Sequence, residues 1–187
     1  YCHNTYFLIR QNNMNILIFG INGNLGRHLI KFLLSQKKKY IICSLDNKKD
    51  ILFRLPNTDK IIEKIIEFKP DIIINLVAYA DVDGCQKNLR RAYISNVLSN
   101  SSISRSINSS LVRLKPHLVH ISTDHVYNRN SFDKENETEI VNNYAFTKFL
   151  GEEAILGTSN TILRTNYIGK SAITEKDSLS DWIINSL

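Results

Sequence analysis

The sequence predicts a doubly wound α/β fold, in which helices cover both faces of a parallel sheet. Short continuous runs of Ile, Val and Leu alternate with segments whose apolar residues recur at helical spacing. Continuous apolar runs are typical of strands that are buried on both faces. A proline directly precedes two of these runs, at Pro70 and Pro116. The length of 187 residues suits one domain with a core of ordinary size.

Five strands and four helices are expected in alternation. The strands are predicted at residues 15–19, 40–44, 71–76, 117–122 and 161–164. The helices are predicted at residues 28–35, 60–68, 90–107 and 144–155, with each proline closing off a helix before a strand. Right-handed crossovers join such units, and their ligands bind at the carboxyl ends of the strands.

Composition and charge narrow the function classes. The net charge is +6, but the lysine clusters at 37–39 and 48–49 lack interleaved aromatic residues, so we interpret them as solvated loops and expect no nucleic acid partner. The apolar stretch 72–80 is shorter than the roughly 20 residues of a membrane span, so no membrane association is expected. The three cysteines lack paired spacing, which favours a reducing, cytoplasmic location and no metal site.

A glycine-rich turn follows the first predicted strand. Gly20, Gly23 and Gly26 stand between that strand and a helix, where glycine lets the backbone approach a pyrophosphate at the helix N-terminus. This context favours nucleotide binding over a merely tight connection. Asp46 ends the second strand region, where a carboxylate binds an adenosine ribose. A helix or turn cap is an equally good interpretation of Asp46.

Tyr144 and Lys148 lie four residues apart at the start of a predicted helix and therefore share one face. A tyrosine has a pKa near 10, and a neighbouring ammonium group favours the phenolate and lowers that pKa. The pair can therefore act as a proton donor. Two unrelated surface residues are the commoner explanation when Tyr-x-x-x-Lys occurs alone.

Several motifs taken together resemble a known family. The glycine turn, "INLVAYADVDGCQKN", "ISTDHVY", "NNYAFTKFLGEE" and "LRTNYIG" occur in the order and at about the spacing of the extended short-chain dehydrogenase/reductase family. Within this family the chain most resembles the dTDP-4-dehydrorhamnose reductases and related nucleotide-sugar reductases. The resemblance covers about residue 15 to the end of the chain, and it implies a Rossmann-type sheet.

The resemblance implies a role for each site residue. Thr123 would bind the substrate carbonyl, Tyr144 would be the catalytic acid, and Lys148 would lower the pKa of the tyrosine and hold the nicotinamide ribose. A hydride that moves onto a carbonyl carbon creates an alkoxide, which needs such a hydrogen bond and a proton. The implied cofactor is NADP or NAD, and its implied binding residues are Gly20, Gly23, Asn24, Leu25, Gly26, Asp46, Val77, Ala78, Tyr79, Tyr144 and Lys148. Asn96 matches a helix asparagine that supports the site, and the implied substrate-binding residues are Asp124, His125 and Asn166.

Two features depart from the family pattern. His125 stands where these reductases commonly have tyrosine, so the surroundings of the substrate differ; a packed or solvent-tipped histidine is a commoner interpretation than proton transfer. The family also continues into a smaller substrate lobe. We therefore expect a leader or disordered tail at 1–13, an NAD(P)-binding Rossmann domain at 14–170, and the start of a truncated substrate lobe at 171–187.

The first functional hypothesis is an NAD(P)-dependent reductase of a 4-keto nucleotide-sugar, with a homodimer allowed. The alternatives are a non-catalytic NAD(P)-binding regulatory subunit that resembles the methionine adenosyltransferase beta subunit, and a nucleotide-sugar epimerase or dehydratase. Intact Tyr144 and Lys148 favour catalysis, whereas an incomplete lobe favours binding without turnover. Asp46 favours NAD, but Arg27 and the nearby lysines favour NADP, so both cofactors stay open.

Overall fold

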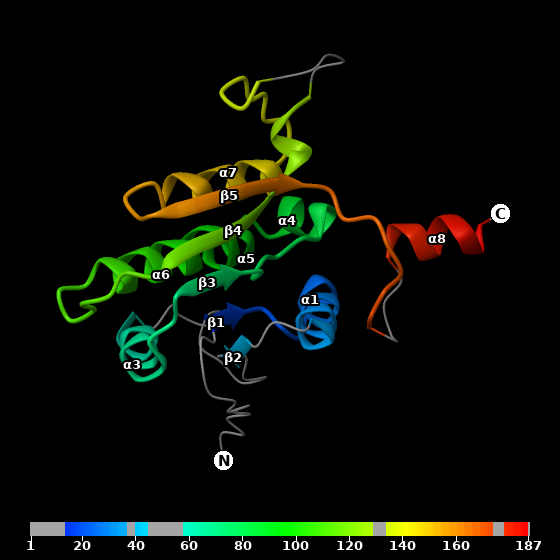
Figure 1. Cartoon of the computed structure of the whole chain (residues 1–187). Coiled ribbons are helices and arrows are strands. Elements are labelled where there is room, and N and C mark those ends of the chain that lie inside the picture. The colour runs from blue at the N-terminus through cyan, green and yellow to red at the C-terminus, as the bar shows by residue number, and fades with distance from the viewer. Residues whose placement is uncertain (1–13, 37–39, 45–57, 129–133, 174–177, 187) are drawn as a thin grey trace.

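The computed structural model describes residues 14–36, 40–44, 58–128, 134–173 and 178–186. Its centre is a five-stranded parallel sheet with the spatial order β2-β1-β3-β4-β5 (Figure 1). The strands are β1 (Met14–Phe19), β2 (Tyr40–Ser44), β3 (Ile72–Asn75), β4 (His117–Thr123) and β5 (Asn160–Thr165). The strand order reverses between β1 and β3, and at such a point a doubly wound sheet opens a crevice beyond the carboxyl ends of its strands.

Helices cover both faces of this sheet, which confirms the predicted fold class. Helix α1 (Asn24–Ser35) packs on one face, and α3 (Thr58–Phe68), α6 (Ser99–Asn108) and α7 (Asn143–Glu153) pack on the other (Figure 1). Between β3 and β4 the chain also forms α4 (Val82–Lys87), α5 (Leu89–Tyr93) and a π-helical turn (Ile94–Leu98) that continues into α6. A short 3-10 turn (Asp124–Val126) follows β4, and α8 (Leu179–Asn185) lies away from the sheet.

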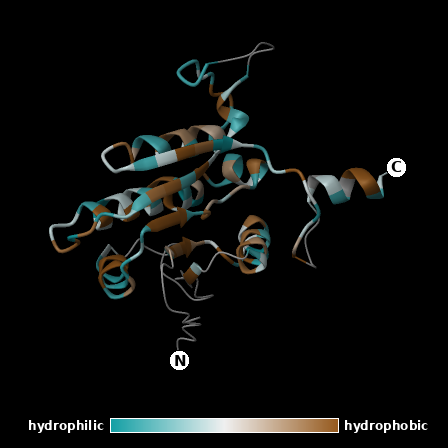
Figure 2. Ribbon diagram, viewed as in Figure 1, coloured by the Kyte–Doolittle hydropathy of each residue, from teal (hydrophilic) through white to brown (hydrophobic). Residues whose placement is uncertain are grey.

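The core has one apolar layer on each face of the sheet. Along β1, Leu17 and Phe19 belong to the layer under α3 and α6, whereas Ile16 and Ile18 belong to the layer under α1. All four side chains are buried, which explains why the strand is a continuous apolar run rather than an alternating one. Figure 2 shows the same concentration of hydrophobic residues in the central strands.

The predicted strands are all present, with ends that shift by at most one residue, but several helices differ; the predicted helix at 90–107 is divided into α5, the π-helical turn and α6. Helix α1 begins at Asn24 rather than at His28, because Gly23 occupies the N-cap position and the glycine turn is itself the start of the helix. Helices α4 and α8 were not predicted; both are short, and α4 begins at a side-chain cap, Asp81, that follows the third strand.

The two prolines have different positions relative to their helices. Helix α3 ends at Phe68, and Lys69 then adopts a left-handed conformation (φ 49°) directly before Pro70. Helix α6 ends at Asn108, well before Pro116, so this proline precedes β4 without ending the helix. In the described part of the chain, no helix is both long enough and apolar enough to cross a membrane.

Candidate functional site

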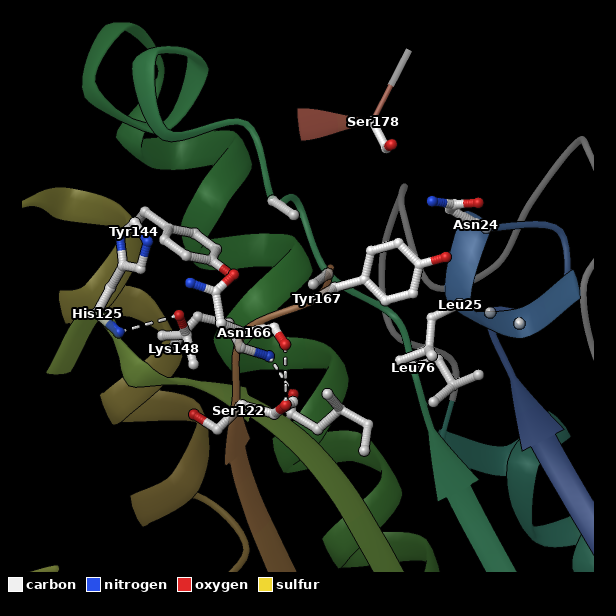
Figure 3. Close-up of a pocket in the computed structure, with 18 of the residues that line it drawn as sticks. Asn24, Leu25, Leu76, Ser122, His125, Tyr144, Lys148, Asn166, Tyr167 and Ser178 are labelled. Carbon is white, nitrogen blue, oxygen red and sulfur yellow. Dashed lines mark hydrogen bonds between the residues drawn. The ribbon is translucent and has the colours of Figure 1, made fainter. Parts of the chain in front are cut away.

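A cavity of about 570 Å³ opens at the carboxyl ends of the central strands. Asn24 and Leu25 of the glycine turn lie on one side of it, and Tyr144, His125 and Lys148 lie on the other (Figure 3). One cavity therefore joins the predicted cofactor turn to the predicted reaction centre. Its lining residues are Gly20, Gly23, Asn24, Leu25, Gly26, Leu76, Ala78, Ala80, Val82, Ile121, Ser122, Thr123, Asp124, His125, Tyr144, Lys148, Thr165, Asn166, Tyr167, Ser171, Ile173 and Ser178.

The three glycines of the turn serve different purposes. Gly20 has a φ of 92°, a conformation that favours glycine, and a β-carbon there would lie 2.9 Å from the backbone carbon of Leu76. A β-carbon on Gly26 would lie 2.4 Å from the carbonyl oxygen of Gly20, so α1 can approach β1 only because this residue is glycine. At Gly23 a β-carbon would meet only the Gly20 oxygen, at 3.4 Å. Gly20 and Gly26 therefore shape the turn, and Gly23 leaves space on the side of the cavity.

This turn fits the pyrophosphate of a dinucleotide. The N-cap residue Gly23 offers no side-chain cap, and the first turn of α1 carries no acidic residue. The positive end of the helix dipole thus faces the cavity without an anionic side chain of its own first turn. This arrangement accommodates the negative charge of an NAD(P) pyrophosphate and lets it come close to the backbone.

Among the described residues, no group of three or more His, Cys, Asp or Glu side chains could hold a metal ion.

Tyr144 and Thr123 meet at the other end of the cavity. Thr123 is the last residue of β4, Tyr144 lies in the first turn of α7, and both residues line the cavity. Burial raises the pKa of Tyr144; the hydrogen bond with Thr123 opposes this effect, and the nearby Cys85 and Asp124 add to it. The phenol is therefore protonated at neutral pH and has a proton to donate.

Lys148 is buried one helical turn after Tyr144. Its Nζ donates a hydrogen bond to the carbonyl oxygen of Ile121 at 2.6 Å and lies 3.5 Å from Nε2 of His120. Burial lowers the pKa of Lys148 from 10.5 to about 8, although the carboxylate of Glu152 raises it. The side chain is therefore still mainly charged at pH 7.

One expectation about this pair differs from what the structure shows. The sequence suggested that Lys148 lowers the pKa of Tyr144, but here the pKa of Tyr144 is raised because loss of hydration around the phenol outweighs the other influences. The ammonium group of Lys148 is directed to the backbone of β4 instead. In this structure the tyrosine is therefore suited to giving up a proton to a stronger base, and it is not a standing phenolate.

Asn96 connects the loop after β3 to helix α7. It lies in the π-helical turn, and its side chain accepts a hydrogen bond from the Tyr79 amide (2.8 Å) and donates one to the Tyr79 carbonyl (3.2 Å). It also donates to the hydroxyl of Thr147 on α7 (3.0 Å). These bonds attach the loop after β3 to the helix that carries Tyr144 and Lys148. The predicted supporting position of Asn96 thus has a definite geometry, and π-helical turns are frequent at functional sites.

The three predicted substrate-binding residues lie together above Thr123. Asn166 donates a hydrogen bond to Asp124 (3.1 Å), and the backbone amide of His125 donates to the Thr123 hydroxyl (3.2 Å). The His125 ring packs edge-on against the Tyr144 ring, with centroids 5.5 Å apart and planes at 86° (Figure 3). His125 is exposed and therefore occupies the open side of the cavity.

The predicted cofactor residues after β3 are not all in the cavity. Ala78 lines it, but Val77 is buried in the core layer under α3 and α6. The ring of Tyr79 lies beneath the guanidinium of Arg91 at 4.2 Å, and its carbonyl accepts a hydrogen bond from the Cys85 thiol. Asp46 falls outside the described residues, so its predicted contact with the adenosine ribose stays a prediction.

A segment after β5 closes one side of the cavity and was missed by sequence reasoning. The Ala172 amide donates a hydrogen bond to the Asn24 side chain (2.6 Å), and Nε2 of His28 lies 3.0 Å from the Lys170 carbonyl oxygen. The rule that ligands bind at strand ends directs attention to Thr165–Gly169, and it is correct for Thr165, Asn166 and Tyr167. No sequence signal indicated the later residues Ser171, Ile173 and Ser178.

Comparisons with known proteins identify the family of the chain. The family model described as "RmlD substrate binding domain" matches residues 14–176. The chain belongs to the RmlD substrate binding domain family. This result confirms the resemblance to the dTDP-4-dehydrorhamnose reductases that was inferred from the sequence motifs.

Curated proteins and solved structures are similar to this chain. A dTDP-4-dehydrorhamnose reductase from Aggregatibacter actinomycetemcomitans is 32% identical over 81% of this chain and 51% of its own length. The structure of a dTDP-4-dehydrorhamnose reductase from Clostridium acetobutylicum matches with a TM-score of 0.74 and 26% identity over 92% of this chain and 59% of that chain. The structure of such a reductase from Bacillus anthracis in complex with NADP matches with a TM-score of 0.69 and 28% identity over 83% and 54% of the two chains. The present chain spans about half the length of the curated relatives it matches.

Proposed function

We propose that this chain is the nucleotide-binding part of an NAD(P)-dependent reductase that acts on a 4-keto nucleotide-sugar, similar to dTDP-4-dehydrorhamnose reductase. The observation that carries the proposal is the single cavity that contains the glycine turn at one end and Thr123, Tyr144 and Lys148 at the other. The names of the relatives support the same reaction and substrate class.

The residues of the cavity fit a bound nicotinamide cofactor. Its pyrophosphate would lie over Gly23 and the first turn of α1, because Gly23 has no side chain and the first turn of α1 carries no acidic residue. The buried ammonium of Lys148 would hold the ribose next to the nicotinamide, on the side of Tyr144. When bound, NADPH or NADH would supply the hydride that reduces the keto carbon.

The chain's own residues would supply the proton and the oxygen contacts. The keto oxygen gains negative charge as the carbon is reduced, and a hydrogen bond from Thr123 would stabilise that charge. Tyr144 would transfer its phenolic proton to the oxygen, which completes the hydroxyl group, and would then regain a proton from solvent. The raised pKa of Tyr144 keeps the proton on the phenol until a stronger base forms beside it.

The choice between NADP and NAD, the domain boundary, the cellular location and the oligomeric state are predictions within this proposal. NADP is favoured by the Bacillus anthracis relative, which was solved in complex with NADP, and by the exposed Arg27 beside the turn. NAD stays open, because Asp46 lies outside the described residues. The boundary at residue 170, the cytoplasmic location and the homodimer likewise remain proposals. Residues 1–13, interpreted as a leader, lie outside the described residues.

The test has a binding part and a turnover part. Calorimetry with NADPH and NADH on this chain should show saturable binding of at least one of them. The full-length protein should then consume the reduced cofactor in proportion to an added dTDP-4-keto-6-deoxy sugar. Absence of binding to either cofactor would overturn the proposal. Binding without reduction would instead favour the regulatory-subunit hypothesis.

A further inference from the structure

An ion pair with a buried carboxylate and a partly exposed guanidinium lies behind the proposed reaction centre. Glu152 on α7 is only 2% exposed, and Arg164 on β5 contacts it through NH2 (2.7 Å to Oε2) and through Nε (3.1 Å to both carboxylate oxygens). NH1 of Arg164 also donates to the Tyr127 hydroxyl and to the Glu135 carbonyl, each at 2.6 Å. The guanidinium and the carboxylate thus meet in a fork, the strong form of this interaction.

This ion pair joins the three elements that carry the site. Glu152 lies one turn after Lys148 on α7, so the two side chains share a face of the helix. Its Oε1 accepts a hydrogen bond from the hydroxyl of Ser122, which directly precedes Thr123 at the end of β4. Arg164 directly precedes Thr165, which lines the cavity at the end of β5. The pair therefore fixes α7 to the ends of β4 and β5 at the level of the cavity floor.

Stability alone does not account for the ion pair. Replacing a buried ion pair with apolar residues of similar volume is often neutral or stabilising, because removing two charges from water is costly. The burial of Glu152, at 2% exposure, therefore needs an explanation other than the stability of the fold. The neighbouring Lys148 offers such an explanation. Its ammonium group is also buried, and without a nearby anion it would lose its proton more easily.

We propose that Glu152 and Arg164 are positioning residues of the cofactor site: together they hold the Lys148 turn of α7 against β4 and β5, and Glu152 keeps the Lys148 ammonium charged. The inference rests on the proposed function, because it assumes a cofactor site at Lys148, but its test requires neither cofactor nor activity. Neither residue lines the cavity, so both act through Lys148.

The charges around Lys148 single out Glu152. His120 is completely buried and lies 3.5 Å from Lys148 Nζ; burial and the ammonium lower its pKa well below the ordinary value, so it is neutral and adds no charge. Glu152 raises the pKa of Lys148 against the effect of burial. Arg164 compensates part of the Glu152 charge. The titratable groups near this end of the cavity include Tyr144 on α7, Asp124 and His125 after β4, and Cys85 on α4.

This arrangement predicts that two substitutions shift the pKa of Lys148 in opposite directions. Glu152→Gln removes the anion and leaves the cation Arg164 behind, and both changes lower the pKa of Lys148. Arg164→Met removes the cation that compensates Glu152, so the carboxylate acts more strongly and the pKa of Lys148 rises. A pair that served only to hold the fold together would shift the pKa of Lys148 in one common direction, or not at all, in the two variants.

The test measures the pKa of Lys148 directly, without cofactor or activity. In protein labelled with ¹³C-lysine, the Cε resonance of Lys148 is assigned by its absence from Lys148→Met and is followed from pH 6 to pH 11. Wild-type protein should titrate near pH 8, Glu152→Gln about one unit lower or more, and Arg164→Met higher. The matched control is Glu153→Gln, which removes an exposed carboxylate one residue away and should leave the titration unchanged.

A second readout uses the cofactor. Since the ammonium would hold the ribose, Glu152→Gln should bind NADPH several-fold more weakly than wild type at pH 8 and with unchanged affinity at pH 6. If Glu152→Gln fails to fold by circular dichroism, Arg164→Met carries the test through its upward shift. Equal pKa values of Lys148 in wild type and the folded variants would overturn the inference and leave the proposed function standing. Lack of NADPH binding by wild type would overturn the function, and the titration would still decide the inference.

Discussion

The ammonium nitrogen of Lys148 lies 2.6 Å from the carbonyl oxygen of Ile121, so the helix that carries Tyr144 is bonded to the end of the strand that carries Thr123. This single contact joins the proposed proton donor to the residue that would bind the substrate oxygen. It also places a buried positive charge at the floor of the cavity, where a cofactor ribose would lie. Two predictions depend on that charge.

The first prediction concerns the pH dependence of cofactor binding. Lys148 has a pKa of about 8, so its charge is lost as the pH rises through that value. NADPH affinity should therefore be constant below about pH 7 and should fall several-fold between pH 7 and pH 9. Lys148→Met should bind NADPH weakly at every pH, without this fall, and should also lose turnover. Fluorescence titrations across this range measure the effect, and Lys87→Met, at an exposed position on α4, is the control. A wild-type affinity that is flat up to pH 10 would contradict the prediction.

The second prediction concerns stability and has the opposite pH dependence. The folded state lowers the pKa of Lys148 from 10.5 to about 8, which corresponds to roughly 3 kcal/mol of cost at pH 7. Below pH 8 Lys148 is protonated in both the folded and the unfolded state, so the full cost of burying its charge is present. Between pH 8 and pH 10.5 only the unfolded state keeps this proton. The free energy of unfolding should therefore rise with pH in this range.

Lys148→Met should remove this rise and should be about 1–3 kcal/mol more stable than wild type at pH 7, after allowance for the lost hydrogen bond to Ile121. Urea unfolding at pH 7 and pH 10 measures both effects. A less stable Lys148→Met variant at pH 7 would show that the burial of the charge is compensated elsewhere.

The third prediction separates chemistry from binding at Tyr144. Tyr144→Phe removes the phenolic hydroxyl but retains the ring that packs against His125. In the full-length protein, turnover of a dTDP-4-keto-6-deoxy sugar should fall by roughly 10²-fold or more, the usual effect of losing a general acid. NADPH affinity should change little. Steady-state rates together with calorimetry on the same preparations distinguish the two effects. Normal turnover by the variant would exclude Tyr144 as the proton donor.

The sequence was sufficient for the sheet because its signals are local. The strands β1 and β3 contain continuous apolar runs, and both faces of β1 are buried, so the apolar run alone identified this strand. The glycine turn and the Tyr144–Lys148 pair were likewise found from spacing. The cavity confirms that these segments converge, since the carboxyl ends of parallel strands share one edge.

Features that depend on tertiary contacts could not be predicted in this way. The raised pKa of Tyr144 reflects burial by neighbouring segments, which no spacing reveals. Arg164 and Glu152 are twelve residues apart and lie on different elements, so nothing local pairs them. The bond between Asn24 and Ala172 spans 148 residues. Val77, expected at the cofactor, is in the core because the chain at the end of β3 directs its side chain under α3 and α6.

The last prediction uses two glycines of the same turn that differ in their surroundings. A β-carbon on Gly23 would meet only one atom, at 3.4 Å, whereas one on Gly26 would lie 2.4 Å from the Gly20 oxygen and 2.6 Å from Cα of Ile21. Gly23→Val should therefore retain the fold, with a circular dichroism spectrum like that of wild type, but should abolish NADPH binding because the side chain occupies the place of the pyrophosphate. Gly26→Val should lose the fold itself, because backbone cannot yield as a flexible side chain can. Calorimetry and thermal unfolding of the two variants give the comparison. Unchanged NADPH affinity in Gly23→Val would remove the glycine turn from the cofactor site, even if Gly26→Val unfolds as expected.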